Sequence, residues 1–113
     1  MEERQAKASA KSLRTSPIRT RIVIDTIRGK DVHEALNILT NMNKKSARLI
    51  KKVLDSAIAN ATNNFGLDID KLYVKEATVD AGPVLKRHFI DSKSHIGRRY
   101  HRTSHINITV AEK

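Results

Sequence analysis

The chain has 113 residues, a formal net charge of +10, four aromatic residues and no cysteine. This length suits one domain with a modest core, and the charge is typical of proteins that bind nucleic acid or a membrane surface. The lack of cysteine excludes disulfides and thiolate metal sites. No apolar run approaches the ~18 residues of a transmembrane helix, so we expect a soluble cytoplasmic protein with no membrane partner.

The N-terminal stretch, residues 4–21, contains six basic residues and no acid. From Ala6 to Lys11 alanine alternates with lysine or serine, a weak period of two. This pattern predicts a strand at the edge of a sheet, since lysine often protects such edges from further pairing. A disordered basic tail explains the same residues equally well, and the sequence alone does not decide between the two.

Three helices are predicted next. Ser16 and Pro17 have the character of an N-cap and a first helical residue, and Gly29 can end this first helix in the left-handed conformation. The stripe that it would bury consists of Ile18, Ile22 and Ile27. Asp31 and Glu34 have the spacing of a capping box, which predicts the start of a second helix. The face that the second helix would bury consists of Val32, Ala35, Leu36 and Leu39.

The third and longest helix is expected from Lys44 to Asn63, with Asn43 as its cap and Gly66 just beyond its end. Its apolar residues repeat every three or four positions and define one buried face: Ala47, Ile50, Leu54, Ala57, Ile58 and Ala61. The opposite side carries Lys44, Arg48, Lys51, Lys52 and Asp55, and we interpret it as a solvated face.

Two strands complete the chain. Residues 72–79 are rich in β-branched side chains, and Ile106, Ile108 and Val110 alternate with polar residues. Lys75 and Glu76 interrupt the alternation of the earlier strand, so its pattern does not reveal which face is buried. An insert of about twenty residues joins the two strands, far more than the 2–5 residues of most hairpin loops.

The insert carries six basic residues and a single acid, Asp91. If it continues the two strands, each arm reaches roughly 33 Å, whereas a compact body of this size has a radius of gyration of about 13 Å. Gly82 and Pro83 predict a kink or bulge at the root of such a projecting arm. A lone two-stranded ribbon is marginally stable in water, and its charge therefore calls for a polyanionic partner.

The order of elements predicts an α+β fold: a small antiparallel three-stranded sheet packed against three helices, with a long projecting β-hairpin. We expect a single domain over residues 1–113, including the hairpin at about residues 82–103.

Histidine is the residue type that most invites a catalytic or metal hypothesis, because His88, His95, His101 and His105 occur close together. Strand rise would separate His101 from His105 by about 13 Å, too far for one metal ion. No carboxylate pair accompanies them, and no glycine-rich phosphate loop exists. We therefore predict no catalytic residue, no metal site, no cofactor and no enzymatic activity.

Several motifs resemble the bacterial-type L twenty-two family of large ribosomal subunit proteins, from about Ser16 to the C-terminus. They are I-R-G-K at 27–30, E-A-L-x-I-L at 34–39, K-V-L-D-S-A-I-A-N-A at 52–61, G-L-D-I-D-K-L at 66–72, G-P-x-L-K-R at 82–87 and R-T-S-H-I at 102–106. The first helix departs from the family pattern, because Ile18 occupies a position where the family usually has arginine.

The resemblance implies a structural protein that binds large-subunit ribosomal RNA (rRNA), aids its assembly and lines the peptide exit tunnel with the tip of its hairpin. Its partners would be large-subunit rRNA, neighbouring ribosomal proteins and the nascent peptide, with the protein a monomer within the cytoplasmic ribosome. The implied rRNA-binding residues are Lys7, Lys11, Arg14, Ser16, Arg19, Arg21, Arg28, Lys30, Lys86, Arg87, Arg98, Arg99, Arg102, Thr103 and His105. The implied tunnel-lining tip is His88, Phe89, Ile90, Asp91, Ser92, Lys93, Ser94, His95, Ile96 and Gly97.

Two alternatives remain open at this point. A basic β-arm can also enter a groove of duplex DNA, and preferential binding to DNA over folded rRNA would favour an architectural DNA-binding protein. A nuclease or metal enzyme built on the late histidines would lose its activity when those histidines are changed to alanine.

Overall fold

The computed structural model describes residues 5–13, 15–82, 85–91 and 95–112, with the backbone alone for residue 12 and residues 85–91 and 95–101. The elements in chain order are β1 (Gln5–Leu13), α1 (Pro17–Ile24), α2 (Val32–Asn41), α3 (Lys45–Ala59), the π-helical turn η1 (Asn60–Asn64), the 3-10 turn η2 (Ile69–Lys71), β2 (Leu72–Ala81), β3 (Leu85–Asp91), β4 (His95–His101) and β5 (Ser104–Glu112).

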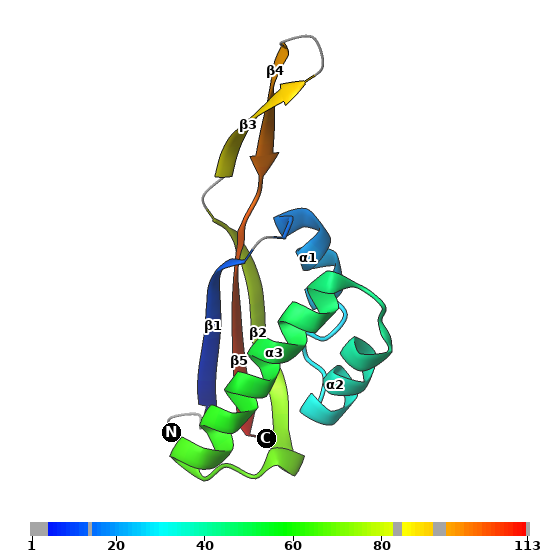
Figure 1. Cartoon of the computed structure of the whole chain (residues 1–113). Helices are drawn as coiled ribbons and strands as arrows, with labels where there is room; N and C mark the ends of the chain where they lie inside the picture. Colours follow the sequence, from blue (N-terminus) through cyan, green and yellow to red (C-terminus); the bar gives the residue numbers. More distant parts are fainter. Residues whose placement is uncertain (1–4, 14, 83–84, 92–94, 113) are drawn as a thin grey trace.

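The predicted α+β fold is confirmed: three helices accompany a three-stranded antiparallel sheet with the order β1-β5-β2 (Figure 1). The last strand of the chain, β5, is thus the central one, because it pairs with β1 on one side and with β2 on the other. The N-terminal stretch forms an edge strand, which confirms that interpretation over a disordered tail.

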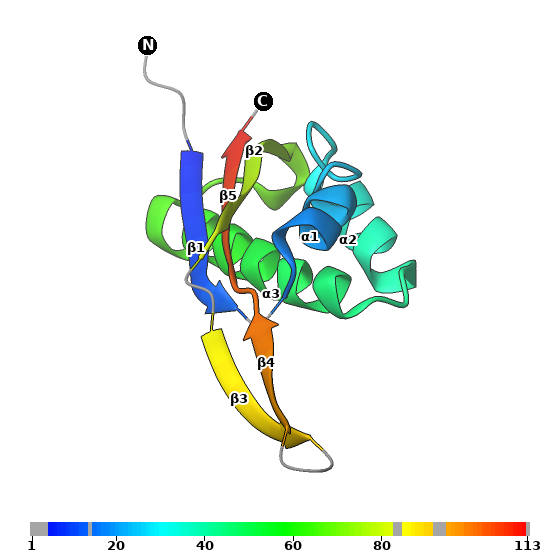
Figure 2. The same ribbon diagram turned by 90° about the horizontal axis from the view of Figure 1, so that it is seen from above.

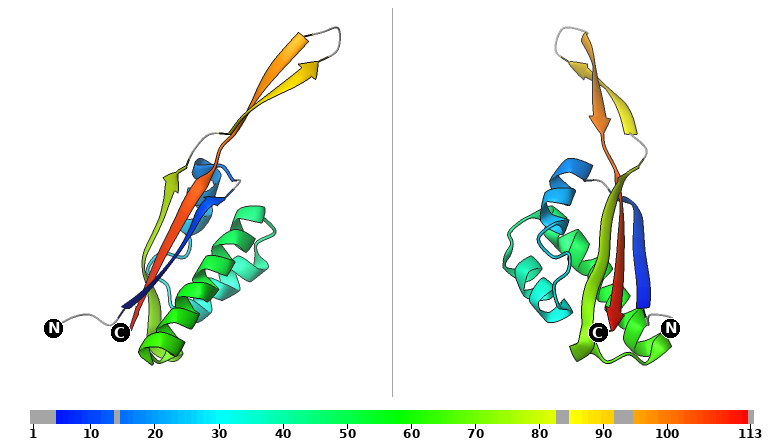
Figure 3. Two further views of the ribbon diagram at one scale, coloured as in Figure 1. Left: turned by 60° about the vertical axis from the view of Figure 1, so that its left-hand side comes forward. Right: turned by 180° about the vertical axis from the view of Figure 1, so that it is seen from behind.

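The three helices cover one face of this sheet (Figures 2 and 3). The core between them is a continuous cluster of buried aliphatic side chains, to which α3 and, with Ala61, the following turn η1 contribute the whole apolar face predicted for the third helix. From the sheet, the inward-facing residues of β5 are Ile106, Ile108 and Val110, all fully buried. The apolar residues of α3 repeat every three or four positions and those of β5 every two positions. These two apolar faces therefore pack against each other between the helix and the sheet.

A bulge in β2 explains why its sequence pattern was ambiguous. Val74 lies opposite Val110, and the next pair is Glu76 with Thr109, so β2 advances two residues while β5 advances one. The extra residue, Lys75, shifts the alternation by one position. Leu72 and Val74 before the bulge, and Ala77 and Val79 after it, consequently face the same buried side.

The predicted buried stripe of the first helix is wrong in part. Ile18 and Ile22 are 64% and 60% exposed, whereas Thr20 and Val23 are buried. Aliphatic residues occur around the whole circumference of α1, so periodicity could not select a face. The helix also ends at Ile24, earlier than predicted, and a chain of turns follows it.

Gly29 has a φ of +79° in these turns, and there the chain docks on β2. The N–H of Gly29 donates to the carbonyl of Val74, and the N–H of Val74 donates to the carbonyl of Lys30, both at 2.9 Å. Gly29 thus ties the start of α2 to the sheet, and the prediction that it ends α1 is wrong, because the C-cap of that helix is Asp25.

The predicted capping interactions of α2 and α3 differ from the observed ones. Asp31 is the N-cap of α2, yet its side chain makes no capping hydrogen bond, and Glu34 instead lies 3.9 Å from the ammonium of Lys30. The N-cap of α3 is Lys44, one residue after the predicted Asn43. At the other end, α3 is followed by the π-helical turn η1, and Gly66 reverses the chain at φ +63°.

Strands β3 and β4 pair with each other in a separate two-stranded antiparallel sheet, from Leu85 opposite His101 to Asp91 opposite His95. Residues 82–84 separate β2 from β3, whereas residues 102–103 separate β4 from β5, so the two sides of the root differ by one residue. The N–H of Gly82 donates to the carbonyl of Thr103 at 2.9 Å across this root. Projection of the ribbon as an arm stays a prediction.

Candidate nucleic-acid interface

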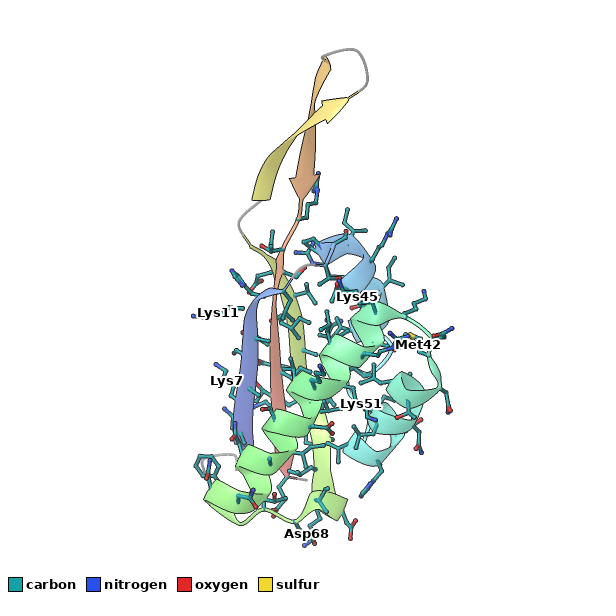
Figure 4. The ribbon with its side chains drawn as sticks, viewed as in Figure 1. Lys7, Lys11, Met42, Lys45, Lys51 and Asp68 are labelled. Atoms are coloured by element: carbon teal, nitrogen blue, oxygen red, sulfur yellow. The ribbon has the colours of Figure 1, made fainter. Side chains whose placement is uncertain are left out.

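A cleft of about 600 Å³ lies where α1 and α3 begin. We call it the cationic cleft, and its lining residues are Thr15, Ser16, Arg19, Ile22, Lys44, Lys45 and Ser46. Three of these side chains are cationic and none is acidic, so the cleft concentrates positive charge. Figure 4 shows Lys45 at the end of α3 that lies nearest α1.

Hydroxyl groups fix the floor of the cationic cleft. The hydroxyl of Thr15 lies 2.9 Å from that of Thr20 and 3.3 Å from that of Ser46, and Thr20 also donates to the carbonyl of Ser16 at 2.8 Å. From the central strand, the hydroxyl of Ser104 donates to the carbonyl of Thr15 at 2.8 Å. These bonds join the segment before α1 to both α3 and β5, so the cleft is preformed.

The backbone adds to the positive potential of the cleft. Ser16 and Lys44 are the N-caps of α1 and α3, and neither side chain makes a capping hydrogen bond. Neither helix has an acid in its first turn. The first N–H groups of a helix have no partner within it and carry a partial positive charge, so they favour an anion such as a phosphate.

Sequence reasoning placed Ser16 and Arg19 in the interface but missed Lys44, which it assigned to a solvated face, and Lys45, to which it assigned no role. A signal for them was present. Positive charge at a helix N-terminus opposes the helix dipole, and two consecutive lysines at that point are a local conflict. Such conflicts mark functional sites more often than structural ones.

Arg21 and Arg28, two predicted rRNA-binding residues, donate to the outer edge of β2. The guanidinium of Arg21 donates to the carbonyl of Val79 at 2.9 Å. That of Arg28 donates to the carbonyl of Ala77 at 2.6 and 3.2 Å and to Asp25 at 2.7 Å. Because β2 is an edge strand, these carbonyls have no strand partner. Both arginines thus fasten α1 and its following turn to the sheet.

The remaining predicted residues of the body are spread over the surface and the root. Lys7 and Lys11 are exposed along β1, as labelled in Figure 4, and Lys30 is exposed beside Glu34. Arg102 is exposed at the root, where Thr103 is 2% exposed and His105 is partly buried. Arg14 lies outside the described residues.

The predicted stem residues Lys86 and Arg87 belong to β3, opposite Tyr100 and Arg99 of β4, and Arg98 pairs with His88. Of the predicted tip, residues 88–91 and 95–97 are strand, and Ser92, Lys93 and Ser94 lie outside the described residues. The two strands therefore run through most of the segment that sequence reasoning assigned to the tip. Side-chain contacts of the arm lie outside the described part of the chain.

Within the described residues, no group of three or more histidine, aspartate or glutamate side chains could hold a metal ion. His33 is an exposed residue whose Nε2 lies 3.0 Å from Oδ1 of Asp70. No helix in the same part of the chain has the length and apolar character needed to cross a membrane.

A small α+β fold with a cationic cleft and one basic edge strand, β1, is typical of the class of nucleic-acid-binding proteins. Comparison with known proteins narrows this class. Residues 8–111 match the family described as ribosomal protein L22p/L17e. The chain is 50% identical over its whole length to large ribosomal subunit protein uL22 of Mycoplasmopsis agalactiae, covering 99% of that protein.

Two further relatives carry the same name. That of Halothermothrix orenii is 50% identical and that of Syntrophomonas wolfei 47% identical, with 96% of each chain covered in both cases. The chain therefore belongs to the ribosomal protein L22p/L17e family. It is a structural protein of the large ribosomal subunit rather than an enzyme, and a component of the cytoplasmic ribosome.

Proposed function

We infer that this protein binds large-subunit rRNA through the cationic cleft and the basic edge strand β1, and that it helps the rRNA domains assemble. The arm at about residues 82–103 extends into the subunit, and its tip, residues 88–97, lines the peptide exit tunnel beside the nascent peptide. Neighbouring ribosomal proteins complete its surroundings, and it acts as a monomer. Family membership and the net positive charge of the arm support this proposed position of the arm within the subunit.

The observation that carries the proposed RNA binding is the convergence of Arg19, Lys44 and Lys45 with two uncapped helix N-termini on one cleft. An RNA phosphate placed there receives charge-assisted hydrogen bonds from side chains and backbone N–H groups together. Exposed Ile22 on the same wall offers an apolar contact to a ribose. Phosphate contacts of this kind fix the register of a protein on RNA without reading its sequence.

The test replaces Lys44 and Lys45, the two lining lysines that the sequence pattern did not assign to the interface. The variant Lys44→Ala/Lys45→Ala and a matched control, Lys51→Ala/Lys52→Ala, lose the same charge from the same helix, but only the first pair lines the cleft. Affinity for a bacterial large-subunit rRNA transcript is measured from 50 to 200 mM salt. Wild-type affinity should fall about 10³–10⁵-fold if six to ten phosphates are contacted.

The cleft variant should reduce the slope of log affinity against log salt by about 2, and the control should leave it nearly unchanged. Equal effects of the two pairs would mean that net charge, rather than the cleft, governs binding. Duplex DNA is included as a competitor, and preferential binding to DNA would favour the architectural DNA-binding alternative.

The arm requires a separate test, because its stabilisation is expected to come from RNA. Amide hydrogen exchange between Val84 and His101 should be rapid in the free protein and slow in assembled subunits, since a lone charged ribbon is marginally stable in water. Slow exchange of these amides in the free protein would contradict the proposed dependence on RNA.

A further inference from the structure

A second cavity, of about 330 Å³, lies beyond the C-terminal end of α3, between η1 and the first residues of β1. We call it the amide pocket, and its lining residues are Gln5, Ala6, Lys7, Asn60, Asn64 and Phe65. It shares no residue with the cationic cleft, which lies at the other end of α3. Asn60 and Asn64 of η1 end in carboxamides, whereas the carboxamide oxygen of Gln5 accepts from the ammonium of Lys75 at 3.1 Å.

The local fold builds this pocket through the π-helical turn. Gly66 reverses the chain at φ +63°, and the N–H of Leu67 donates to the carbonyl of Ala61 at 3.0 Å. Leu67 is buried at 4% exposure, whereas Phe65 is 56% exposed. The turn thus sends one apolar residue into the core and the aromatic residue beside it outward. π-Helical turns of this kind often occur at functional sites.

A hydrogen bond across the pocket holds its two sides together. The amide nitrogen of Asn60 donates to the backbone carbonyl of Lys7 at 3.0 Å, which fixes η1 against β1. This bond uses one donor of the Asn60 amide and leaves its oxygen able to accept. Asn64 lines the same space, and Lys7 borders it where its backbone carbonyl accepts from Asn60.

The combination of lining groups indicates a particular ligand. A single exposed apolar residue is ordinary on a protein surface. Here, however, the exposed residue is aromatic and borders a cavity with carboxamides, which donate to and accept from the edges of bases. Unpaired bases of RNA characteristically stack on aromatic side chains while their edges form hydrogen bonds.

Charge and size favour a base over a phosphate or a large ligand. The C-terminal end of a helix carries a partial negative charge, which disfavours a phosphate inside the pocket but not an uncharged base. The volume lies at the lower end of the range for small-molecule pockets. A protein partner would be expected to meet a drier and more apolar patch than one lined by Asn60 and Asn64.

We propose that the amide pocket binds one unpaired nucleobase of RNA, with Phe65 stacking on the base and Asn60 and Asn64 hydrogen-bonding to its edge. This inference rests on the proposed RNA-binding function and adds a base contact to it. The amide pocket would thereby recognise a single-stranded nucleotide, whereas the cationic cleft contacts the backbone.

The test compares a labelled ten-nucleotide oligoadenylate with an abasic RNA backbone of the same length. Binding of full-length wild type, Phe65→Ala and Phe65→Tyr is measured by fluorescence anisotropy at several salt concentrations. Ile18→Ala serves as the control, since it truncates an equally exposed apolar side chain outside both cavities. Phe65 is exposed, so its truncation should leave the fold intact, which circular dichroism checks.

Phe65→Ala should bind oligoadenylate about 5- to 150-fold more weakly than wild type, which is the range for loss of one stacked base. Its salt slope should not change, because no charge is removed. Phe65→Tyr should retain the wild-type affinity, and the abasic backbone should bind wild type and Phe65→Ala equally. Ultraviolet crosslinking to oligoadenylate should attach RNA to the tryptic peptide Val53–Lys71, which has no internal lysine or arginine.

Equal affinity of wild type and Phe65→Ala for oligoadenylate, with salt-dependent binding retained, would overturn the base contact and leave the proposed function standing. Salt-independent binding of the wild type would instead overturn the proposed function itself. If Phe65→Ala weakened binding of oligoadenylate and of the abasic backbone equally, the ring would affect RNA binding by stabilising the fold and not by contacting a base. Unchanged RNA binding together with loss of a neighbouring protein from large subunits carrying Phe65→Ala would assign the ring to a protein contact.

Discussion

Gly82 at the root of the arm offers a test of how closely β2 and β5 approach each other there. A Cβ added at this position would lie 2.5 Å from Oγ1 of Thr103 and 3.2 and 3.3 Å from ring atoms of His105. Thr103 is 2% exposed and β-branched, so its side chain has little freedom to move away. The hydrogen bond from Gly82 to the carbonyl of Thr103 also prevents the two segments from separating freely.

We therefore expect Gly82→Ala to destabilise the isolated protein by about 1–3 kcal/mol, the usual cost of forcing an extra group into a packed site. For a domain of this size, that corresponds to a fall in Tm of roughly 4–15 °C. Thr103→Ala removes the atom that clashes, so the double variant should recover most of the loss. The measurement is the free energy of unfolding in urea for a double-mutant cycle of Gly82→Ala and Thr103→Ala.

Gly29→Ala is the matched control for this cycle. An added Cβ at Gly29 meets nothing within 4 Å, but the residue has a φ of +79°. Its cost of about 1–2 kcal/mol comes from backbone strain, which Thr103→Ala cannot relieve. Additivity of Gly82→Ala and Thr103→Ala to within about 0.5 kcal/mol would refute the steric account of Gly82.

Two further predictions concern the body of the protein. Leu54→Ala, at a fully buried position, should cost about 2–5 kcal/mol in urea unfolding, whereas Leu49→Ala, on a partly buried neighbouring position, should cost clearly less; similar losses would argue against the assigned core. Arg21→Ala combined with Arg28→Ala should lower stability by about 1–3 kcal/mol, because three bonds from exposed guanidinium groups to β2 carbonyls are lost. Arg19→Ala should instead leave stability within about 0.5 kcal/mol and reduce the salt slope of rRNA binding by about 1, and the reverse pattern would show that the two roles are misassigned.

Elements with strong, local sequence patterns could be predicted without any structure. The apolar face of α3, the alternation of β5, the proline at the start of α1 and the glycine just after η1 all reflect preferences of the backbone over a few residues. Family motifs added the identity of the protein as a large-subunit ribosomal protein. None of these inferences required knowledge of which segments meet in space.

The roles of chemically equivalent residues, in contrast, depend on how the elements pack in three dimensions. Arg19 and Arg21 are two positions apart in a basic helix, yet one lines the cationic cleft and the other donates to the edge of β2. Lys44 joins Arg19 because α3 begins beside α1, and Phe65 borders a pocket because η1 packs on β1. The physical reason is that charge and hydrophobicity are properties of single residues, whereas clefts and free carbonyl edges arise from segments far apart in the chain.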